Sequence, residues 1–378
     1  MKFKIQRKEL LQNIQHVTSV ISSKTVIPIL SGLKIDTKND GITLTGSNSD
    51  ITIQSTIPTT IDDEEIITNI NEGSIVLPVP QFPEIISKLP EDIVDITVED
   101  NYKTVIKSGT AVFTLYGQSS DEYPVIQHQQ ASPHFGFNIK ELKSVIKQTV
   151  FAVSTMETRP VLTGINVIIE GNDITFTATD SHRLAMRKSS LENSEIDEAN
   201  IVIPGKSLQE LNKVLDDKVE EVQVAILNNQ IVFFTDRLFF SSRLLSGNYP
   251  ETSRLIPQNS ETKIHIYTKD LIQTIERAAL LSNREQNNVI DLETKTNNNI
   301  QISGKMQEVG EVTEQLSAIS IEGNDIKISF SSKYMLDSLK TLEHETVTIN
   351  FTGAMRPFVI KTPDDDSILQ LILPVKTF

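Results

Sequence analysis

The chain has 378 residues, of which 22% are charged, and a net charge of −15 at neutral pH. No apolar run approaches the roughly 20 residues that span a bilayer, and the start resembles no secretion leader, so we expect neither membrane insertion nor secretion. The lack of cysteine excludes disulfides and thiolate metal sites and fits a cytoplasmic location. The acidity argues against nucleic-acid binding by the whole surface, because phosphates require a local positive field.

Three short segments near the N-terminus recur later in the chain in the same order and at a constant spacing. The matched pairs are Lys8–Leu10 with Lys140–Leu142, Ile27–Leu33 with Arg159–Ile165, and Ile42–Thr45 with Ile174–Thr177. A third copy is marked by Lys269–Leu271 and, after a small change in length, by Ile300–Gly304. Because a fixed period is the signature of repeated structural units, the sequence predicts three similar domains.

Each copy is predicted to contain a strand, a helix and hairpin strands, followed by a second strand, helix and further strands. Over residues 139–153, Leu142, Val145 and Ile146 begin a stripe with helical spacing, which predicts a helix with one buried face. The segment Gln230–Thr235 lies between turn signals and is rich in β-branched and aromatic residues, which predicts a strand. The predicted fold is therefore α+β, with three domains that each consist of two βαβββ-like halves.

Two polar segments that contain proline separate the copies. Tyr123-Pro124 precedes the segment Gln127–Pro133, and Tyr249-Pro250 precedes the segment Pro257–Thr262. Such segments are typical of short surface connections. We therefore expect domains at residues 1–128, 129–256 and 257–378.

Basic side chains recur on one face of the predicted helices, roughly opposite the apolar stripe. The positions are Lys140, Lys143, Lys147 and Arg277 on the first helix of a copy, and Lys88, Lys206, Lys213, Lys333 and Lys340 on the second. Lysines on one exposed helix usually serve solubility only. Their recurrence at matched positions in an acidic chain leaves two interpretations open. The lysines serve solubility alone, or the helices share one side of a curved array and form a basic concave surface.

Three short motifs contain the residue types of catalytic or ligand-binding sites but lack the arrangement that such sites need. Asp180-Ser181-His182 contains the residue types of a hydrolase triad, but neighbours in an extended segment point to opposite faces, so a shared proton would need a sharp turn. Before Gly205-Lys206-Ser207, the glycine that should begin a phosphate-binding loop is Asn200. The Asp364–Asp366 run lacks the spacing of a calcium loop, and whether it binds an ion is left open. We therefore expect no catalytic residue, no metal site and no cofactor.

Three segments carry a resemblance to a known family. Thr179–Ala185 resembles the T-D-x-H-R-L-A signature of bacterial DNA sliding clamps, the DNA polymerase III beta subunits, while Tyr249–Pro257 and Leu373–Val375 resemble its second signature and its C-terminal tail. The resemblance spans the chain. It implies a crescent of three clamp domains that dimerises head to tail into a closed ring around double-stranded DNA. It also implies a non-catalytic processivity factor that slides without sequence specificity and tethers replicative and repair polymerases.

The resemblance further implies three sets of contact residues. Lys24 and Arg159 match positions that touch DNA, and the dimer interface matches Phe113, Leu115, Leu280 and Leu281. The pocket for partner peptides matches Leu162, Thr179, His182, Arg183, Leu184, Pro250, Arg254, Leu255, Met355, Leu373, Pro374 and Val375. The implied partners are the DNA polymerase III alpha subunit, the clamp-loader delta subunit, and other polymerases and repair proteins that carry short linear peptides.

Two features depart from that family, and two other classes of protein stay open. Ser181 stands where glycine is common, and the tail ends in Lys376-Thr377-Phe378, so the peptide preference is undefined. The residues alone also suit a repeat-built interaction scaffold that does not bind DNA, or a hydrolase. Retention on circular DNA at high salt would exclude the scaffold, and inactivity toward ester, peptide and nucleotide substrates would count against the hydrolase.

Overall fold

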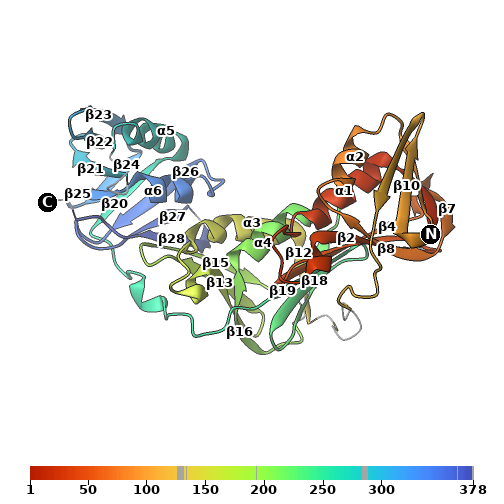
Figure 1. The fold of residues 1–378 in the computed structure, drawn as a ribbon. Helices are drawn as coiled ribbons and strands as arrows, with labels where there is room; N and C mark the ends of the chain where they lie inside the picture. The colour runs from red at the N-terminus through yellow and green to blue at the C-terminus, as the bar shows by residue number, and fades with distance from the viewer. Residues whose placement is uncertain (126–131, 133, 193, 283–287, 364, 377–378) are drawn as a thin grey trace. The chain divides into compact units, whose positions relative to one another are not determined.

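The computed structural model of the protein describes residues 1–125, 132, 134–192, 194–282, 288–363 and 365–376 (Figure 1). The predicted linker 127–133 lies outside the described residues apart from Ser132, and so do Asp364 and the last two residues of the tail. The chain forms two compact units. Residues 1–140, 192–195 and 206–244 make up the first, and residues 141–191, 196–205 and 245–378 make up the second.

The first unit contains two main antiparallel sheets and the helices packed on them. Its helices are α1 (Arg7–Thr18), α2 (Phe82–Lys88) and all but the first residue of α4 (Gly205–Val214). Its strands are β1 (Lys2–Gln6), β2 (Gly32–Lys38), β3 (Gly41–Ser47), β4 (Ile51–Pro58), β5 (Thr60–Ile61), β6 (Glu64–Glu65), β7 (Ile67–Asn71), β8 (Gly73–Pro78), β9 (Ile93–Val98), β10 (Lys103–Ser108), β11 (Ala111–Tyr116), β12 (Phe135–Asn138), β17 (Glu221–Ile226), β18 (Gln230–Phe234) and β19 (Leu238–Arg243). The sheet orders are β11-β10-β9-β1-β7 and β12-β17-β18-β19-β4-β3-β2-β8, and β5 pairs with β6. Helix α1 packs against α2, β3 and β4.

The second unit repeats this plan with a nine-stranded and a four-stranded sheet. Its helices are α5 (Thr268–Ala279), α6 (Ser332–Leu339) and most of α3 (Ile139–Thr149). Its strands are β13 (Gly164–Glu170), β14 (Asp173–Thr179), β15 (Arg183–Ser190), β16 (Glu198–Pro204), β20 (Thr262–Tyr267), β21 (Val289–Lys295), β22 (Asn299–Met306), β23 (Gly310–Ser317), β24 (Ser320–Gly323), β25 (Lys327–Ser331), β26 (Thr346–Phe351), β27 (Phe358–Thr362) and β28 (Asp365–Ile372). The orders are β16-β13-β14-β15-β28-β27-β26-β20-β24 and β23-β22-β21-β25. Helix α5 packs against α6, β22 and β23.

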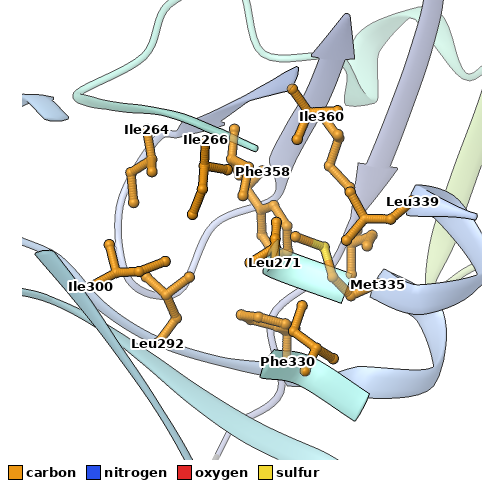
Figure 2. Packing of buried hydrophobic residues seen from close by; sticks show 14 of the residues in the cluster. Ile264, Ile266, Leu271, Leu292, Ile300, Phe330, Met335, Leu339, Phe358 and Ile360 are labelled. Atoms are coloured by element: carbon orange, nitrogen blue, oxygen red, sulfur yellow. The ribbon is translucent and has the colours of Figure 1, made fainter. Parts of the chain in front are cut away.

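The apolar core beneath α5 and α6 shows how the sequence pattern builds a unit. Leu271 of α5 and Met335 of α6 are fully buried, and Figure 2 shows both beside Phe330 and Phe358. The two phenylalanine rings meet edge to face with their centroids 5.4 Å apart. Burying each such side chain contributes roughly 1.5–3 kcal/mol. The core therefore fixes both helices, and with them the end of α5 and the exposed face of α6.

The threefold repeat predicted from the sequence is confirmed by the order of the elements. Each copy contains two halves with the order strand, helix and three strands: β1-α1-β2-β3-β4 and β8-α2-β9-β10-β11 in the first copy, and their counterparts in the others. At the start of the first helix of each copy, one backbone amide donates to a carbonyl beyond the second helix. These contacts are Arg7 to Asp92 at 2.7 Å, Ile139 to Glu220 at 2.9 Å, and Thr268 to Glu345 at 2.9 Å. The α+β fold of βαβββ-like halves is therefore confirmed.

Two predicted elements end earlier than the sequence pattern. The helix that begins at Ile139 ends at Thr149 and continues as a 3-10 turn over Val150–Ala152. The Thr149 hydroxyl donates to the Val145 carbonyl at 2.7 Å, and two adjacent β-branched residues disfavour a further helical turn. The strand that begins at Gln230 ends at Phe234, because the next amide, that of Thr235, closes a turn.

Strand pairing joins each copy to the next along the chain. In the first unit, β4 of the first copy pairs antiparallel with β19 of the second. In the second unit, β15 of the second copy pairs antiparallel with β28 of the third. The second copy therefore contributes strands to both units.

Candidate functional sites

The loop between β14 and β15 is closed by hydrogen bonds among its own residues. The Thr179 hydroxyl donates to the Arg183 carbonyl at 2.6 Å and accepts from the Ser181 amide at 3.1 Å. One Asp180 carboxylate oxygen accepts from the amides of His182 and Arg183 at 2.9 and 3.1 Å. The Asp180 carboxylate thus holds backbone amides, and the His182 ring stacks on Tyr334 with centroids 6.2 Å apart. This arrangement is that of a structural loop and differs from a catalytic triad.

Arg183 is only 7% exposed, and its donors point into the protein. Its Nε lies 3.0 Å from Asp180 Oδ2, its Nη1 lies 2.6 Å from Asp337 Oδ2, and its Nη2 donates to the Phe151 carbonyl at 2.6 Å. The guanidinium also lies 4.6 Å from the centre of the Tyr334 ring. This geometry favours a structural role for Arg183, which holds the loop, over direct contact with a peptide.

The predicted pocket residues differ in how far they are exposed. Leu162, Thr179, Arg183 and Leu184 are buried. Leu373, Pro374 and Val375 are half-buried. The exposed members are His182, Pro250, Arg254, Leu255 and Met355. In this structure a ligand would therefore meet the exposed and half-buried members, with the buried ones as support.

Apolar side chains on neighbouring strands form a small cluster beside this loop. Leu184 lies opposite Leu371 across β15 and β28, and Leu371 lies opposite Val359 across β28 and β27. These three residues are buried together, with Met186 and Leu369 packed against them. Cross-strand neighbours lie on the same face of a sheet, so one face of this junction carries an apolar row.

The tail and the Tyr249-Pro250 segment are both anchored near the loop. The Leu373 amide donates to the His182 carbonyl at 2.9 Å, and the Val375 amide donates to the Ser329 carbonyl at 2.8 Å. The Tyr249 hydroxyl accepts from the Thr179 amide at 3.0 Å, and burial raises the pKa of this phenol well above its ordinary value. Three segments distant in sequence are thus brought to one place.

Two residues of this site were missed by the sequence reasoning, Tyr334 and Asp337 of α6. They stand three positions apart and so share a helix face. That spacing is the only local signal, because their partner Arg183 lies 154 positions away from Asp337 in the chain. Helical and strand periodicity act over a few residues and do not connect positions so far apart.

The basic residues of the helices are exposed, apart from the half-buried Lys143, and many are paired with carboxylates. The pairs are Lys88–Glu84 at 2.7 Å, Lys213–Glu210 at 2.7 Å, Lys340–Glu276 at 2.7 Å, Lys147–Glu343 at 2.6 Å, Lys333–Asp337 at 2.8 Å and Arg277–Glu314 through Nε at 2.8 Å. The hydrogen bond from Lys147 holds the pKa of Glu343 below its ordinary value. Among the described residues, Lys24, Lys140, Arg159 and Lys206 are exposed and form no ion pair. Exposed pairs contribute only about 0–1 kcal/mol, so the paired lysines can exchange partners.

Three of the four predicted interface residues lie at edge strands, and the fourth, Leu280, is exposed at the end of α5. Phe113 and Leu115 belong to β11, the edge strand of the five-stranded sheet. Leu280 is 76% exposed just after α5. A Cβ on Gly310, the first residue of β23, would lie 3.9 Å from Leu281 Cδ1. Leu281 therefore adjoins β23, the edge strand of the four-stranded sheet, which the sequence reasoning had not identified.

Asp365 and Asp366, the described residues of the acidic run for which the sequence leaves ion binding open, have partners within the protein. Asp365 accepts from Ser367 and lies 3.3 Å from Arg187 Nη1, and Asp366 lies 3.2 Å from Lys361 Nζ. Within the part of the chain that the structure describes, no group of three His, Asp or Glu side chains is arranged to hold a metal ion. None of the described helices has the length and apolarity needed to cross a membrane.

Comparison with known proteins gives matches along the whole chain. Family models of the DNA polymerase III beta subunit match at residues 1–127 for the N-terminal domain, 137–251 for the central domain and 253–376 for the C-terminal domain. The beta sliding clamp of Bacillus subtilis (strain 168) is 50% identical over 380 residues, which covers 100% of both chains. The crystal structure of the Bacillus subtilis DNA polymerase sliding clamp matches with a TM-score of 0.95 and covers 100% of both chains. That of the Streptococcus pneumoniae DNA polymerase III beta chain matches with a TM-score of 0.94 at 40% identity, again over 100% of both chains. The chain therefore belongs to the DNA polymerase III beta subunit family, the bacterial beta sliding clamps.

Proposed function

We propose that the protein is a non-catalytic, cytoplasmic processivity factor that works as a homodimeric ring. The ring encircles duplex DNA, slides without reading its sequence and tethers DNA polymerases through a peptide-binding pocket. The observation that carries this proposal is the pair of open sheet edges, β11 and β23. Exposed edges invite pairing with another chain, and apolar side chains such as Phe113 favour it.

The internal repeat identifies the partner of each edge. The two junctions within the chain are β4 with β19 and β15 with β28. In element order, β23 is the third-copy counterpart of β4 and β15, and β11 is the first-copy counterpart of β19 and β28. The missing junction is therefore β23 of one copy with β11 of a second copy. Two such contacts between different patches close a twofold ring.

The repeat also supports a register for that junction. Ile53 lies opposite Gly46 in its hairpin, Ala185 opposite Ala178, and Val312 opposite Gly304. Across the two internal junctions, Ile53 pairs with Phe240 and Ala185 with Gln370. The residue of β11 that corresponds to Phe240 and Gln370 is Phe113, because Phe113 lies opposite Ile106 as Phe240 lies opposite Phe233. Phe113 of one copy should therefore lie opposite Val312 of the other, and Leu115 opposite Gly310, beside Leu281.

The helix lysines and the loop residues Lys24 and Arg159 are proposed to contact DNA phosphates. Such contacts bind and position a duplex without specifying its sequence, as a sliding ring requires. The weak ion pairs with carboxylates support rapid exchange between protein and phosphate partners. They also keep much of this surface neutral until DNA is present.

The loop, the tail and the Tyr249-Pro250 segment are proposed to form the pocket for partner peptides. Leu255 and Met355 are 52% and 58% exposed, and the half-buried tail residues supply further apolar surface. An exposed, largely apolar surface with a few polar groups suits a short linear peptide. The proposed partners are the DNA polymerase III alpha subunit, the clamp-loader delta subunit, and other polymerases and repair proteins.

The proposal is tested by loading the protein on nicked circular DNA with a clamp loader. A ring should stay on the circle at high salt, where phosphate contacts are screened, and should leave after the circle is cut. A protein bound only by charge would leave the intact circle at high salt, which would contradict encirclement.

A further inference from the structure

A stack of cationic and aromatic side chains lies behind the loop that carries His182. The Arg183 guanidinium lies 5.3 Å from the centre of the Phe151 ring and 4.6 Å from that of Tyr334. On Tyr334 the His182 ring stacks at an interplanar angle of 19°. Phe151, His182 and Arg183 come from the second copy of the repeat and Tyr334 from the third. The stack therefore connects the two copies that border the proposed pocket.

A buried guanidinium requires carboxylates nearby, and Arg183 has two. Asp180 belongs to the same loop, so its bond at 3.0 Å shapes the loop but does not attach it to anything else. Asp337 belongs to α6, and its bond at 2.6 Å attaches the loop to the third copy. Removing one partner of a buried charge pair is strongly unfavourable, so Asp337 controls where Arg183 lies.

We propose that Asp337 is a positioning residue of the peptide pocket. By holding Arg183 against Tyr334, Asp337 fixes the orientation of the loop Thr179–Arg183. That loop presents the exposed His182 ring and supplies the carbonyl that accepts from the Leu373 amide at 2.9 Å. Asp337 thus positions both the His182 ring and the tail at Leu373 without touching a peptide. This inference rests on the proposed function, since it assumes that partner peptides dock at this place.

The test compares Asp337→Asn with Asp337→Glu and with a matched control, Lys333→Ala. Lys333 pairs with the same Asp337 oxygen at 2.8 Å but is exposed, so its loss should leave Arg183 in place. The readouts are the affinity for a fluorescent peptide from the clamp-binding segment of a polymerase III alpha subunit, and amide hydrogen exchange at His182 and Arg183. Asp337→Asn should weaken peptide binding by about tenfold, as expected for one lost charge-assisted hydrogen bond. It should also speed exchange at both amides, while Asp337→Glu restores part of each and Lys333→Ala changes neither.

A merely structural role would lower the melting temperature without changing peptide affinity well below that temperature. Binding by Asp337→Asn within twofold of the unmodified protein, with unchanged exchange, would overturn the inference. Failure of the unmodified protein to bind the peptide would instead contradict the proposed pocket, as would equal binding by a chain lacking Leu373–Phe378. The exchange readout needs no peptide, so in that case it still decides whether Asp337 positions the loop.

Discussion

Ser181 adopts a backbone conformation that residues other than glycine rarely take, with φ at +77°. The left-handed region costs an L-residue roughly 1–2 kcal/mol, and a glycine would avoid this cost. Glycine also loses more conformational entropy on folding than serine does, which offsets part of the stabilisation. Ser181→Gly should therefore raise the free energy of unfolding by about 0.5–1 kcal/mol in urea denaturation. Ser181→Ala is the control, because it keeps the Cβ. Equal stability of the Gly and Ala variants would show that no strain is stored there.

Tyr249 gives the protein a predicted weakness at alkaline pH. Burial raises the pKa of the phenols of Tyr249 and Tyr123 above the ordinary value, so in the unfolded chain they ionise first. Their contribution to stability is present below about pH 10, the pKa of an unfolded tyrosine, and is lost as the pH rises above it. The melting temperature of Tyr249→Phe, measured from pH 8 to 11, should fall less steeply than that of the unmodified protein. Parallel curves would contradict this account.

At the scale of elements, the end of α5 is predicted to hold the dimer together. Leu280 is 76% exposed and Leu281 adjoins β23, so both would be buried against β11 of a second copy. Changing Leu280 to Ala and Leu281 to Lys removes this apolar contact and introduces a charge that cannot be buried unpaired. The double variant should sediment as a folded monomer, with the circular dichroism spectrum of the unmodified chain. A dimer that persists at low micromolar concentration would exclude this interface.

The second helix of each copy is predicted to contribute one recurring phosphate contact. Replacing Lys88, Lys213 and Lys340 by glutamate should weaken retention on DNA, and each lost contact should reduce the logarithmic salt slope by about 0.9. Sequence preference should not change. A matched control places glutamate at three exposed lysines of the strands, Lys38, Lys188 and Lys305. If both triple variants lose retention equally, only net charge matters and the helix lysines have no special role.

The whole molecule was predictable from its sequence where the signal was periodic. Three copies and their βαβββ-like halves could be predicted because apolar spacing and matched segments recur along the chain. The sequence did not reveal which strands of neighbouring copies pair with each other, since the pairing of β4 with β19 depends on tertiary contacts between copies. The open edge of β23 was missed for the same reason, because a strand is an edge only in relation to its neighbours.

The candidate site was predictable only in part, for a related reason. Thr179–Arg183 could be singled out as a local motif, and the structure brings the tail to it through the Leu373 amide. The burial of Arg183 between Phe151 and Tyr334 depends on helix α6, whose only local signal is the spacing of Tyr334 and Asp337. Local patterns thus identified the loop but did not show what holds it.

Covalent closure of the ring on DNA is the most direct test of the central claim. The chain has no cysteine, so Phe113→Cys with Val312→Cys adds the only two thiols. Directly opposed residues of antiparallel strands lie about 4.5–5.5 Å apart between Cα atoms, which suits a disulfide. The variant should be loaded on a nicked circle, oxidised and denatured with detergent, with Phe113→Cys and Glu314→Cys as an out-of-register control.

The cross-linked protein should remain linked to the intact circle after denaturation and should be released when the circle is cut. The out-of-register control should form no covalent ring. Complete cross-linking followed by release from the intact circle would contradict a ring that encircles DNA.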